Sequence, residues 1–182
     1  EDVATSKTID FGTTENDRQK LNEDGITLTN SGTIAYNANT AVQTVSGKSG
    51  ITIINNALGR IANTVAGNDF AIKGQSQTNL TITNSGTIES LDKFAIEIKD
   101  STGTVITNNA GGIITAGNET IFGTGASNTT ITNSGKIYVT GTNRAINLSS
   151  STGTTITNNA GGEIYKHSSV SNAKEIINIG AD

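Results

Sequence analysis

The sequence predicts an all-β protein that folds as a right-handed parallel β-helix, a solenoid of about six to seven rungs with three short strands per rung. Three observations lead to this prediction. An asparagine motif recurs at a nearly fixed period, apolar residues alternate with threonine before each copy, and no segment carries the apolar stripe of an amphipathic helix. A fixed period of about 20–50 residues is typical of stacked repeat architectures.

The motif occurs six times, in two forms that alternate along the chain. The short form reads Asn-Ser-Gly-x-Ile and the long form reads Asn-Asn-Ala-x-Gly-x-Ile. Successive first asparagines are 25, 29, 24, 25 and 25 positions apart. The chain therefore consists of six coils of about 25 residues, which also pair into a larger unit of about 50 residues.

Each repeat contains three segments that fit short strands. The first, as in 26–28 (Ile-Thr-Leu), alternates apolar residues with threonine, the pattern of a half-buried strand. The second follows the glycine turn, as in 135–139, and the third follows a polar connection, as in 94–98. Glycine, asparagine and serine occupy the turns between these segments.

Stacking the rungs at about 4.8 Å, the strand spacing of a sheet, would place the apolar residues of successive repeats above one another inside the helix. We expect two inward columns. The first holds Ile26, Ile51 and Leu80, followed by Leu28, Ile53, Ile82, Ile106, Ile131 and Ile156. The second holds Ile34, Ile61, Ile88, Ile114, Ile137 and Ile164.

The first asparagine of each motif is expected to form a ladder at one corner of the helix. An asparagine amide offers two donors and an acceptor, so each side chain can hydrogen-bond the amide of the next rung. This structural role is favoured over a ligand-binding role. The six residues are Asn30, Asn55, Asn84, Asn108, Asn133 and Asn158.

The repeats run through residues 25–182, and residues 1–24 differ from them in composition. Ten of the 28 charged residues lie in this first segment. A polar terminal segment can protect the exposed strand edges of a solenoid, so we expect an N-terminal capping segment, with 8–11 as a strand and 16–24 folded over the end. An acidic docking arm is the alternative. The uncapped strand-like segment 176–179 suggests a piece of a longer protein.

The composition argues against several classes of function. The net charge is −4 and no basic block is present, which disfavours nucleic acid and anionic membranes as partners. The chain has no cysteine, so it has no disulfide, thiol nucleophile or cysteine metal site. No apolar run approaches the length of a membrane span. We expect no cofactor and no insertion of this segment into a membrane.

A search for catalytic residues finds no complete set, so the sequence predicts a non-enzymatic protein. The single histidine, His167, lies in the polar stretch 167–169, and no Gly-x-Ser-x-Gly elbow surrounds any serine. Glycoside hydrolysis needs two carboxyl groups about 5–10 Å apart. Glu89 shares an outward register with Thr115, Tyr138 and Tyr165, so it is the one acid there. Glu97 shares a register with Lys73 and Asn147, again without an acidic partner. No metal site is expected, because one histidine does not make a zinc site.

Four residues form a candidate binding patch. Tyr138 and Tyr165 are expected on neighbouring rungs, one above the other, and Lys136 and Glu163 beside them share a register. A cross-strand aromatic pair and an exposed ion pair would explain them structurally. Tyrosine is also enriched at binding hot spots, so the four residues could contact a glycan or a protein.

The runs Thr-Ile-Thr-Asn-Ser-Gly-x-Ile and Thr-Asn-Asn-Ala-Gly-Gly-x-Ile, threonine-rich and free of cysteine, resemble the passenger domains of Gram-negative autotransporters, which are type V secretion proteins. The resemblance covers residues 25–182. It implies a parallel β-helix exported to the bacterial cell surface or released from it. The activity is left open, because passengers of this family include adhesins, self-associating factors, toxins and enzymes.

These points together lead to an expected function. We expect a surface-displayed or secreted passenger that binds host cells, through a receptor, matrix or glycan, as an adhesin or a released effector ligand. Two alternatives stay open. One is a self-associating aggregation or biofilm factor, whose partner is another copy of itself, and the other is a structural stalk that displays a functional domain. An enzyme is the third hypothesis, against which the single histidine and the unpaired acids count.

Overall fold

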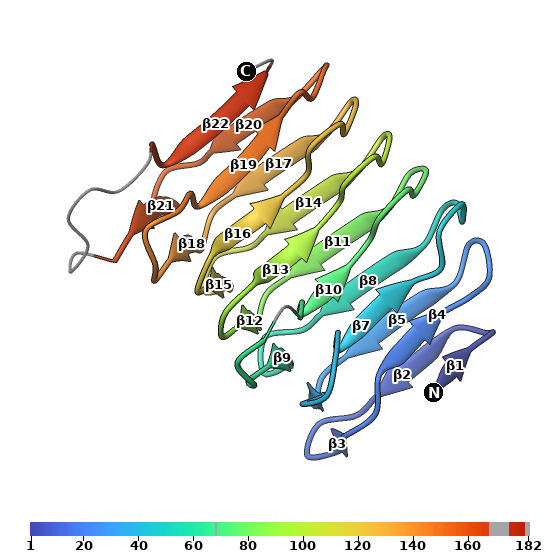
Figure 1. The fold of residues 1–182 in the computed structure, drawn as a ribbon. Coiled ribbons are helices and arrows are strands. Elements are labelled where there is room, and N and C mark those ends of the chain that lie inside the picture. Colours follow the sequence, from blue (N-terminus) through green and yellow to red (C-terminus); the bar gives the residue numbers. More distant parts are fainter. Residues whose placement is uncertain (68, 168–174, 181–182) are drawn as a thin grey trace.

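The computed structural model describes residues 1–67, 69–167 and 175–180. The chain forms an all-β parallel solenoid of about six turns, in which three strands make up each rung and no described residue is helical. Figure 1 shows the rungs stacked into a rod with the two ends of the chain at opposite ends. The predicted all-β solenoid with three strands per rung is confirmed.

Every third strand along the chain belongs to the same parallel sheet. Sheet A contains β1 (Asp2–Val3), β4 (Gln19–Leu21), β7 (Val42–Thr44), β10 (Ile72–Lys73), β13 (Phe94–Glu97), β16 (Glu119–Phe122), β19 (Ile146–Ser149) and β22 (Ile177–Gly180). Sheet B contains β2 (Lys7–Ile9), β5 (Thr27–Asn30), β8 (Thr52–Asn55), β11 (Thr81–Asn84), β14 (Val105–Asn108), β17 (Thr130–Asn133) and β20 (Thr155–Asn158). Sheet C contains β3 (Thr14–Glu15), β6 (Thr33–Ala35), β9 (Arg60–Asn63), β12 (Thr87–Ser90), β15 (Ile113–Ala116), β18 (Lys136–Val139) and β21 (Glu163–Lys166).

The core is a set of straight columns, because equivalent residues of successive rungs pair directly. Ile82 pairs with Ile53 on one side and with Ile106 on the other, and all three are buried. The column of Ile34, Ile61 and Ile88 in sheet C is likewise buried. The predicted inward residues face the core, and among them only Ile156 and Ile164 are partly exposed. The first expected column is in fact two, because Ile26 and Leu28 lie two residues apart on one rung and each pairs with its own equivalent on the next.

One column changes chemistry half-way along the rod. The position before each sheet B strand holds Ile26, Ile51 and Leu80 in the first rungs and Thr104, Thr129 and Thr154 in the later ones. Thr104 and Thr129 are 0% exposed, and the hydroxyl oxygens of all three threonines have no hydrogen-bond partner in the described part of the chain. A buried hydroxyl without a partner is destabilising, so this half of the column contributes less to the stability of the fold than the half that holds isoleucine and leucine.

The asparagine corner is a continuous hydrogen-bonded ladder. Each side-chain amide donates to the Oδ1 atom of the next asparagine, at 2.8 Å for Asn30 to Asn55 and 2.7 Å for Asn133 to Asn158. The three intervening steps are 2.8 Å each. All members except Asn158 are buried, and their amide groups donate to one another and to backbone carbonyl groups of the turn. The Oδ1 atom of Asn30, the first member, accepts no hydrogen bond from the described residues.

The two forms of the motif fit one corner because their glycines coincide. Asn30 donates to the carbonyl oxygen of Gly32 two residues later, and Asn55 donates to that of Gly59 four residues later. The long form therefore adds two residues to the turn without moving the glycine. A Cβ atom on Gly86 would lie 2.1 Å from the Gly59 carbonyl oxygen, so this position is restricted to glycine by the close approach of neighbouring rungs.

Residues 1–24 form strands of the solenoid. β2 pairs with β5 in sheet B and β3 pairs with β6 in sheet C. The expectation that 16–24 folds over the end is wrong, because Gln19–Leu21 forms β4 and lies between β1 and β7 in sheet A. Gln19 and Leu21 are fully buried on either side of the partly exposed Lys20, but Gln19 and Lys20 are both polar, so no polar–apolar alternation marks this strand in the sequence.

Candidate functional site

The predicted patch lies on the outer face of sheet C. In each of its strands from β6 to β21 the isoleucine of the motif faces the core, so the residue after it faces outward. The register places Glu89, Thr115, Tyr138 and Tyr165 in one outward column, as the sequence predicted. Ala62 precedes Glu89 in the same column. The column thus runs from a small residue through an acid and a hydroxyl to two aromatic rings.

The four patch residues are brought together. The rings of Tyr138 and Tyr165 stack with their centroids 5.0 Å apart and an interplanar angle of 13°. Lys136 and Glu163 pair in register, with Nζ 3.7 Å from Oε1 and side chains 50% and 54% exposed. An ion pair this exposed contributes little to stability. It keeps a charge of each sign beside the aromatic pair.

A hollow of about 230 Å³ opens beside Tyr138. It forms because Thr115 is small, while the residues on the rungs before and after it, Glu89 and Tyr138, have long side chains. Its wall also includes Asn63, Thr64, Ser90, Leu91 and Thr140. Leu91 is an exposed apolar side chain, and no described residue hydrogen-bonds the Thr115 hydroxyl. The hollow therefore combines an aromatic face, an apolar side chain and several polar groups.

Glu89 is held in place by Arg60 from the preceding rung. The Arg60 Nε and Nη2 atoms lie 2.6 Å and 2.5 Å from the same carboxylate oxygen, Oε1. No hydrogen bond within the described chain reaches the other oxygen, Oε2. The guanidinium thus fixes the orientation of the carboxylate and leaves one oxygen to accept a hydrogen bond from outside.

A second aromatic cluster lies on the outer face of sheet A, and sequence reasoning missed it. Three of the four phenylalanines stack along the rod: Phe70 and Phe94 with centroids 5.5 Å apart, and Phe94 and Phe122 with centroids 4.4 Å apart. All three fall in the third strand segment of successive repeats, a signal that the sequence contained. Lys73, Lys93, Glu97 and Lys99 surround the rings.

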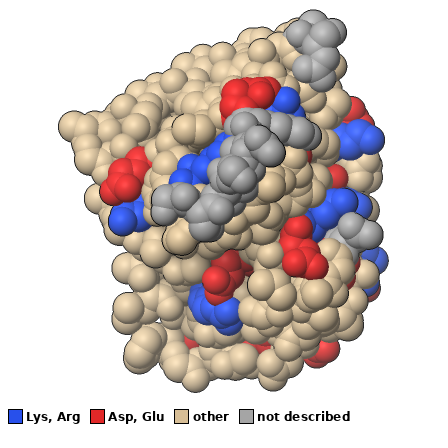
Figure 2. All heavy atoms as spheres, turned by 60° about the vertical axis from the view of Figure 1, so that its left-hand side comes forward, with Lys and Arg blue, Asp and Glu red and all other residues tan. Residues whose placement is uncertain are grey.

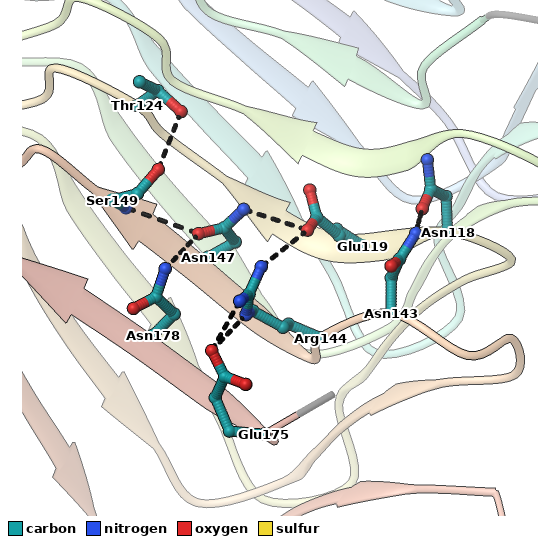
Figure 3. A network of polar contacts seen from close by, with 9 residues as sticks. All are labelled: Asn118, Glu119, Thr124, Asn143, Arg144, Asn147, Ser149, Glu175 and Asn178. Atoms are coloured by element: carbon teal, nitrogen blue, oxygen red, sulfur yellow. Dashed lines mark hydrogen bonds and ion pairs between the residues drawn. The ribbon is translucent and has the colours of Figure 1, made fainter. Parts of the chain in front are cut away.

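A polar network follows this cluster toward the C-terminal end of sheet A (Figure 3). Arg144 donates from Nε and Nη2 to Glu175 at 2.7 Å and 2.5 Å, and its Nη1 lies 3.8 Å from Glu119. Asn147 donates to Glu119 at 2.9 Å and accepts from Asn178 at 3.1 Å. A backbone hydrogen bond of Glu175 itself and the Arg144 guanidinium lower the pKa of Glu175. These groups satisfy one another, so the network is an internal support of the sheet.

The outer face of sheet B carries no charge from β5 to β20. Two outward columns follow its strands, and their hydroxyl groups make no hydrogen bond within the described chain. The first column is Thr27, Thr52, Thr81, Val105, Thr130 and Thr155, and the second is Thr29, Ile54, Thr83, Thr107, Thr132 and Thr157. A regular array of hydroxyl groups at the rung spacing is therefore available to water or to a partner.

The described residues give little support for other kinds of site. They include no group of three or more histidine, cysteine, aspartate or glutamate side chains able to hold a metal ion. His167 is exposed after β21, and Ser168 and Ser169 lie outside the described residues. None of the described segments forms a helix long and apolar enough to cross a bilayer. On the side shown in Figure 2, charged side chains of both signs lie in small mixed groups among uncharged residues.

Comparisons with protein-family models, with curated proteins and with solved structures find no match for this chain.

Proposed function

We propose that this chain is a non-enzymatic, ligand-binding part of an exported bacterial protein, an autotransporter-like passenger displayed on the cell surface or secreted, which binds host cells. The resemblance of its repeats supports the export route. The parallel solenoid supports a rod that presents side chains from many rungs on one face. Among host-cell ligands, a glycan fits the outer face of sheet C best.

The hollow between Glu89 and Tyr138 carries this proposal. The two residues are two rungs apart, about 9.6 Å, which leaves a slot about one rung wide over Thr115. Because Tyr165 covers one face of the Tyr138 ring, the opposite face points along the column toward this slot. A sugar ring could stack its C–H face on Tyr138 and donate a hydroxyl hydrogen bond to Glu89 Oε2.

Saturable binding to host cells tests the proposal. The purified, labelled chain is added to cultured mammalian cells with excess unlabelled chain as competitor. We expect competed binding that the double variant Tyr138→Ala/Tyr165→Ala loses while its circular dichroism stays unchanged. The matched control is Asn109→Ala/Asn159→Ala on the same rod, two turn residues that donate to Ser85 and Ser134. Enzymatic removal of cell-surface glycans should abolish binding. Absence of competed binding would contradict the proposal.

Self-association is a second candidate function, and the threonine array of sheet B favours it. Ten threonine hydroxyl groups in two ranks lack partners within the described chain, and two rods could pair these ranks in register. The molecular mass in solution, measured by sedimentation over a wide concentration range, tests this candidate. We expect a concentration-dependent rise that Thr83→Lys/Thr107→Lys removes. A constant monomeric mass, together with no cell binding, would leave a structural stalk.

A further inference from the structure

The outer face of sheet A contains a second hollow, of about 390 Å³, over the phenylalanine stack. Phe94 forms its floor and is 7% exposed, and Phe70 and Phe122 lie on either side of it along the rod. Lys73 Nζ lies 5.4 Å from the Phe70 ring centroid and Lys93 Nζ lies 5.1 Å from that of Phe94. Cations on aromatic faces keep the lysine side chains close to the surface and hold their ammonium groups over the hollow.

Glu97 lines the same hollow, and one of its carboxylate oxygens accepts no hydrogen bond from the residues that the structure describes. Its side chain is 8% exposed, and its buried Oε2 atom has no hydrogen-bond partner. Lys73 Nζ is 4.0 Å away, which is within range of an ion pair but too long for a hydrogen bond. Burial raises the pKa of Glu97, although Lys73, Lys99 and Lys93 oppose the shift. A donor on a bound ligand would give this oxygen the hydrogen-bond partner that buried polar atoms usually have.

The charges around the hollow are complementary to an anion. Three lysines, Lys73, Lys93 and Lys99, lie near two acids, Glu97 and Asp100, so the local balance is one positive charge in a chain whose net charge is −4. A ligand must therefore bring negative charge to the lysines and, close to it, an O–H or N–H donor for Glu97. It must also tolerate the edges of the phenylalanine rings. Thr124 adds a hydroxyl group at the rim.

The sheet itself determines how such a ligand can be recognised. β13, which supplies Phe94 and Glu97, pairs with β10 on one side and with β16 on the other. Its backbone groups are therefore used within the sheet, and an added peptide strand finds no free edge here. Recognition has to rely on side chains alone. A saccharide suits this requirement, because its hydroxyl donors and acidic groups are close together on one ring and its C–H faces are apolar.

We propose that the hollow formed by Phe70, Phe94 and Phe122 with Glu97 and the three lysines is a binding site for an acidic saccharide, a sugar that carries carboxylate or sulfate groups. A ring hydroxyl donates to Glu97 Oε2, and the acidic group lies among the ammonium groups of Lys73, Lys93 and Lys99. The apolar face of the sugar packs on the exposed parts of Phe70 and Phe122. This site is separate from the sheet C hollow and does not depend on the function proposed above.

Titration of the isotope-labelled chain with three acidic probes tests the site. The probes are a heparin hexasaccharide, a de-esterified oligogalacturonide and sialyllactose, with lactose as the neutral control, and the readout is the shift of phenylalanine ring resonances in NMR spectra. At least one acidic probe should shift the resonances of Phe70, Phe94 and Phe122 in a saturable way, and lactose should not. Because the attraction is electrostatic, added salt should weaken the interaction.

Two variants locate the contacts. Lys73→Gln/Lys99→Gln removes two cations and should raise the dissociation constant at least tenfold, and Glu97→Ala should raise it several-fold by removing the acceptor. The matched control is Lys48→Gln, a lysine on another part of the rod that pairs with Glu23 and should leave the affinity unchanged. Circular dichroism of each variant confirms that it folds.

Three outcomes would overturn the proposal. The first is that none of the acidic probes shifts the ring resonances at millimolar concentration. The second is that lactose binds as strongly as the acidic probes, which would remove the role of charge. The third is that a short polyglutamate peptide binds more tightly than every saccharide, which would assign the site to an acidic protein segment. Loss of cell binding in the Tyr138/Tyr165 variant with retained probe binding would separate this site from that of sheet C.

Discussion

The asparagine ladder gives a prediction whose size can be worked out from the structure, for the substitution Asn108→Ala. The Asn108 amide is fully buried and donates to Asn133 Oδ1 at 2.8 Å. Its second hydrogen is shared between the carbonyl oxygens of Gly112 at 3.2 Å and Lys136 at 3.3 Å, and its Oδ1 accepts from Asn84 at 2.8 Å. The substitution removes about three hydrogen bonds, each contributing about 1 kcal/mol, so we expect a loss of about 3 kcal/mol.

The neighbours limit the loss to about this value. After the substitution the Asn84 amide still donates to the Gly86 carbonyl oxygen at 3.1 Å, and Asn133 Oδ1 still accepts from the Gly135 amide at 3.2 Å. Neither neighbour is therefore left without a partner, and the larger penalty of an unsatisfied buried group does not apply. For a domain of this size, about 3 kcal/mol corresponds to a fall in melting temperature of roughly 6–12 °C.

The adjacent residue provides the control. Asn109 is half-buried at the turn, and its amide donates one side-chain hydrogen bond, to Ser85 Oγ at 2.8 Å. Asn109→Ala should therefore reduce stability by about 1 kcal/mol or less. Both variants are unfolded by heat and by urea and followed by far-ultraviolet circular dichroism. If Asn108→Ala loses no more stability than Asn109→Ala, the ladder does not stabilise the rod and the reasoning is refuted.

Three further predictions concern other parts of the rod. Thr129→Val replaces a fully buried hydroxyl group, which has no partner among the described residues, by a methyl group of similar shape. The free energy of unfolding should therefore rise by about 1–3 kcal/mol, and the melting temperature should rise with it. A fall in melting temperature would show that the hydroxyl is satisfied. Gly86→Ala should destabilise the rod, because its Cβ would meet the Gly59 carbonyl oxygen; an unchanged urea midpoint would refute this. Glu97, which faces Lys73, Lys93, Lys99 and Asp100, has a raised pKa, so the folded state binds more protons than the unfolded state above the ordinary glutamate pKa of about 4.3. The stability of the natural chain relative to Glu97→Gln should therefore fall as pH rises from about 4 to neutrality, and a difference independent of pH would contradict the raised pKa.

Much of the candidate site on sheet C could be predicted from the sequence, because its residues lie at a fixed short distance from the motif. Tyr138 and Tyr165 each follow the motif isoleucine directly, at Ile137 and Ile164. Any register that stacks the isoleucines also stacks the tyrosines, and the structure pairs them so. The hollow beside them was not predicted, since it depends on two separate loops, after β9 and after β12, which position Thr64 and Leu91 near Thr115.

The sheet A site could not be derived in the same way. Connections of unequal length separate its strands from those of sheet C, as between Ser90 and Phe94 and between Val139 and Ile146. Counting from the motif therefore does not give the register. The structure pairs Phe94 with Glu119 and Glu97 with Phe122, so that the Phe94 and Phe122 rings meet along a diagonal. The sequence grouped Glu97 with Lys73 and Asn147 but did not place Phe122 between them.

The sequence by itself determined the rung, the corner and the core, because the period-two alternation and the repeat of about 25 residues are local properties that every coil carries. The tertiary structure decided which outward side chains of different rungs become neighbours. That choice depends on strand register across connections of different length and on how deeply each side chain is buried. The same dependence leaves the Oε2 atom of Glu97 without a hydrogen bond from the described residues, while Glu119, one rung away, accepts one from Asn147.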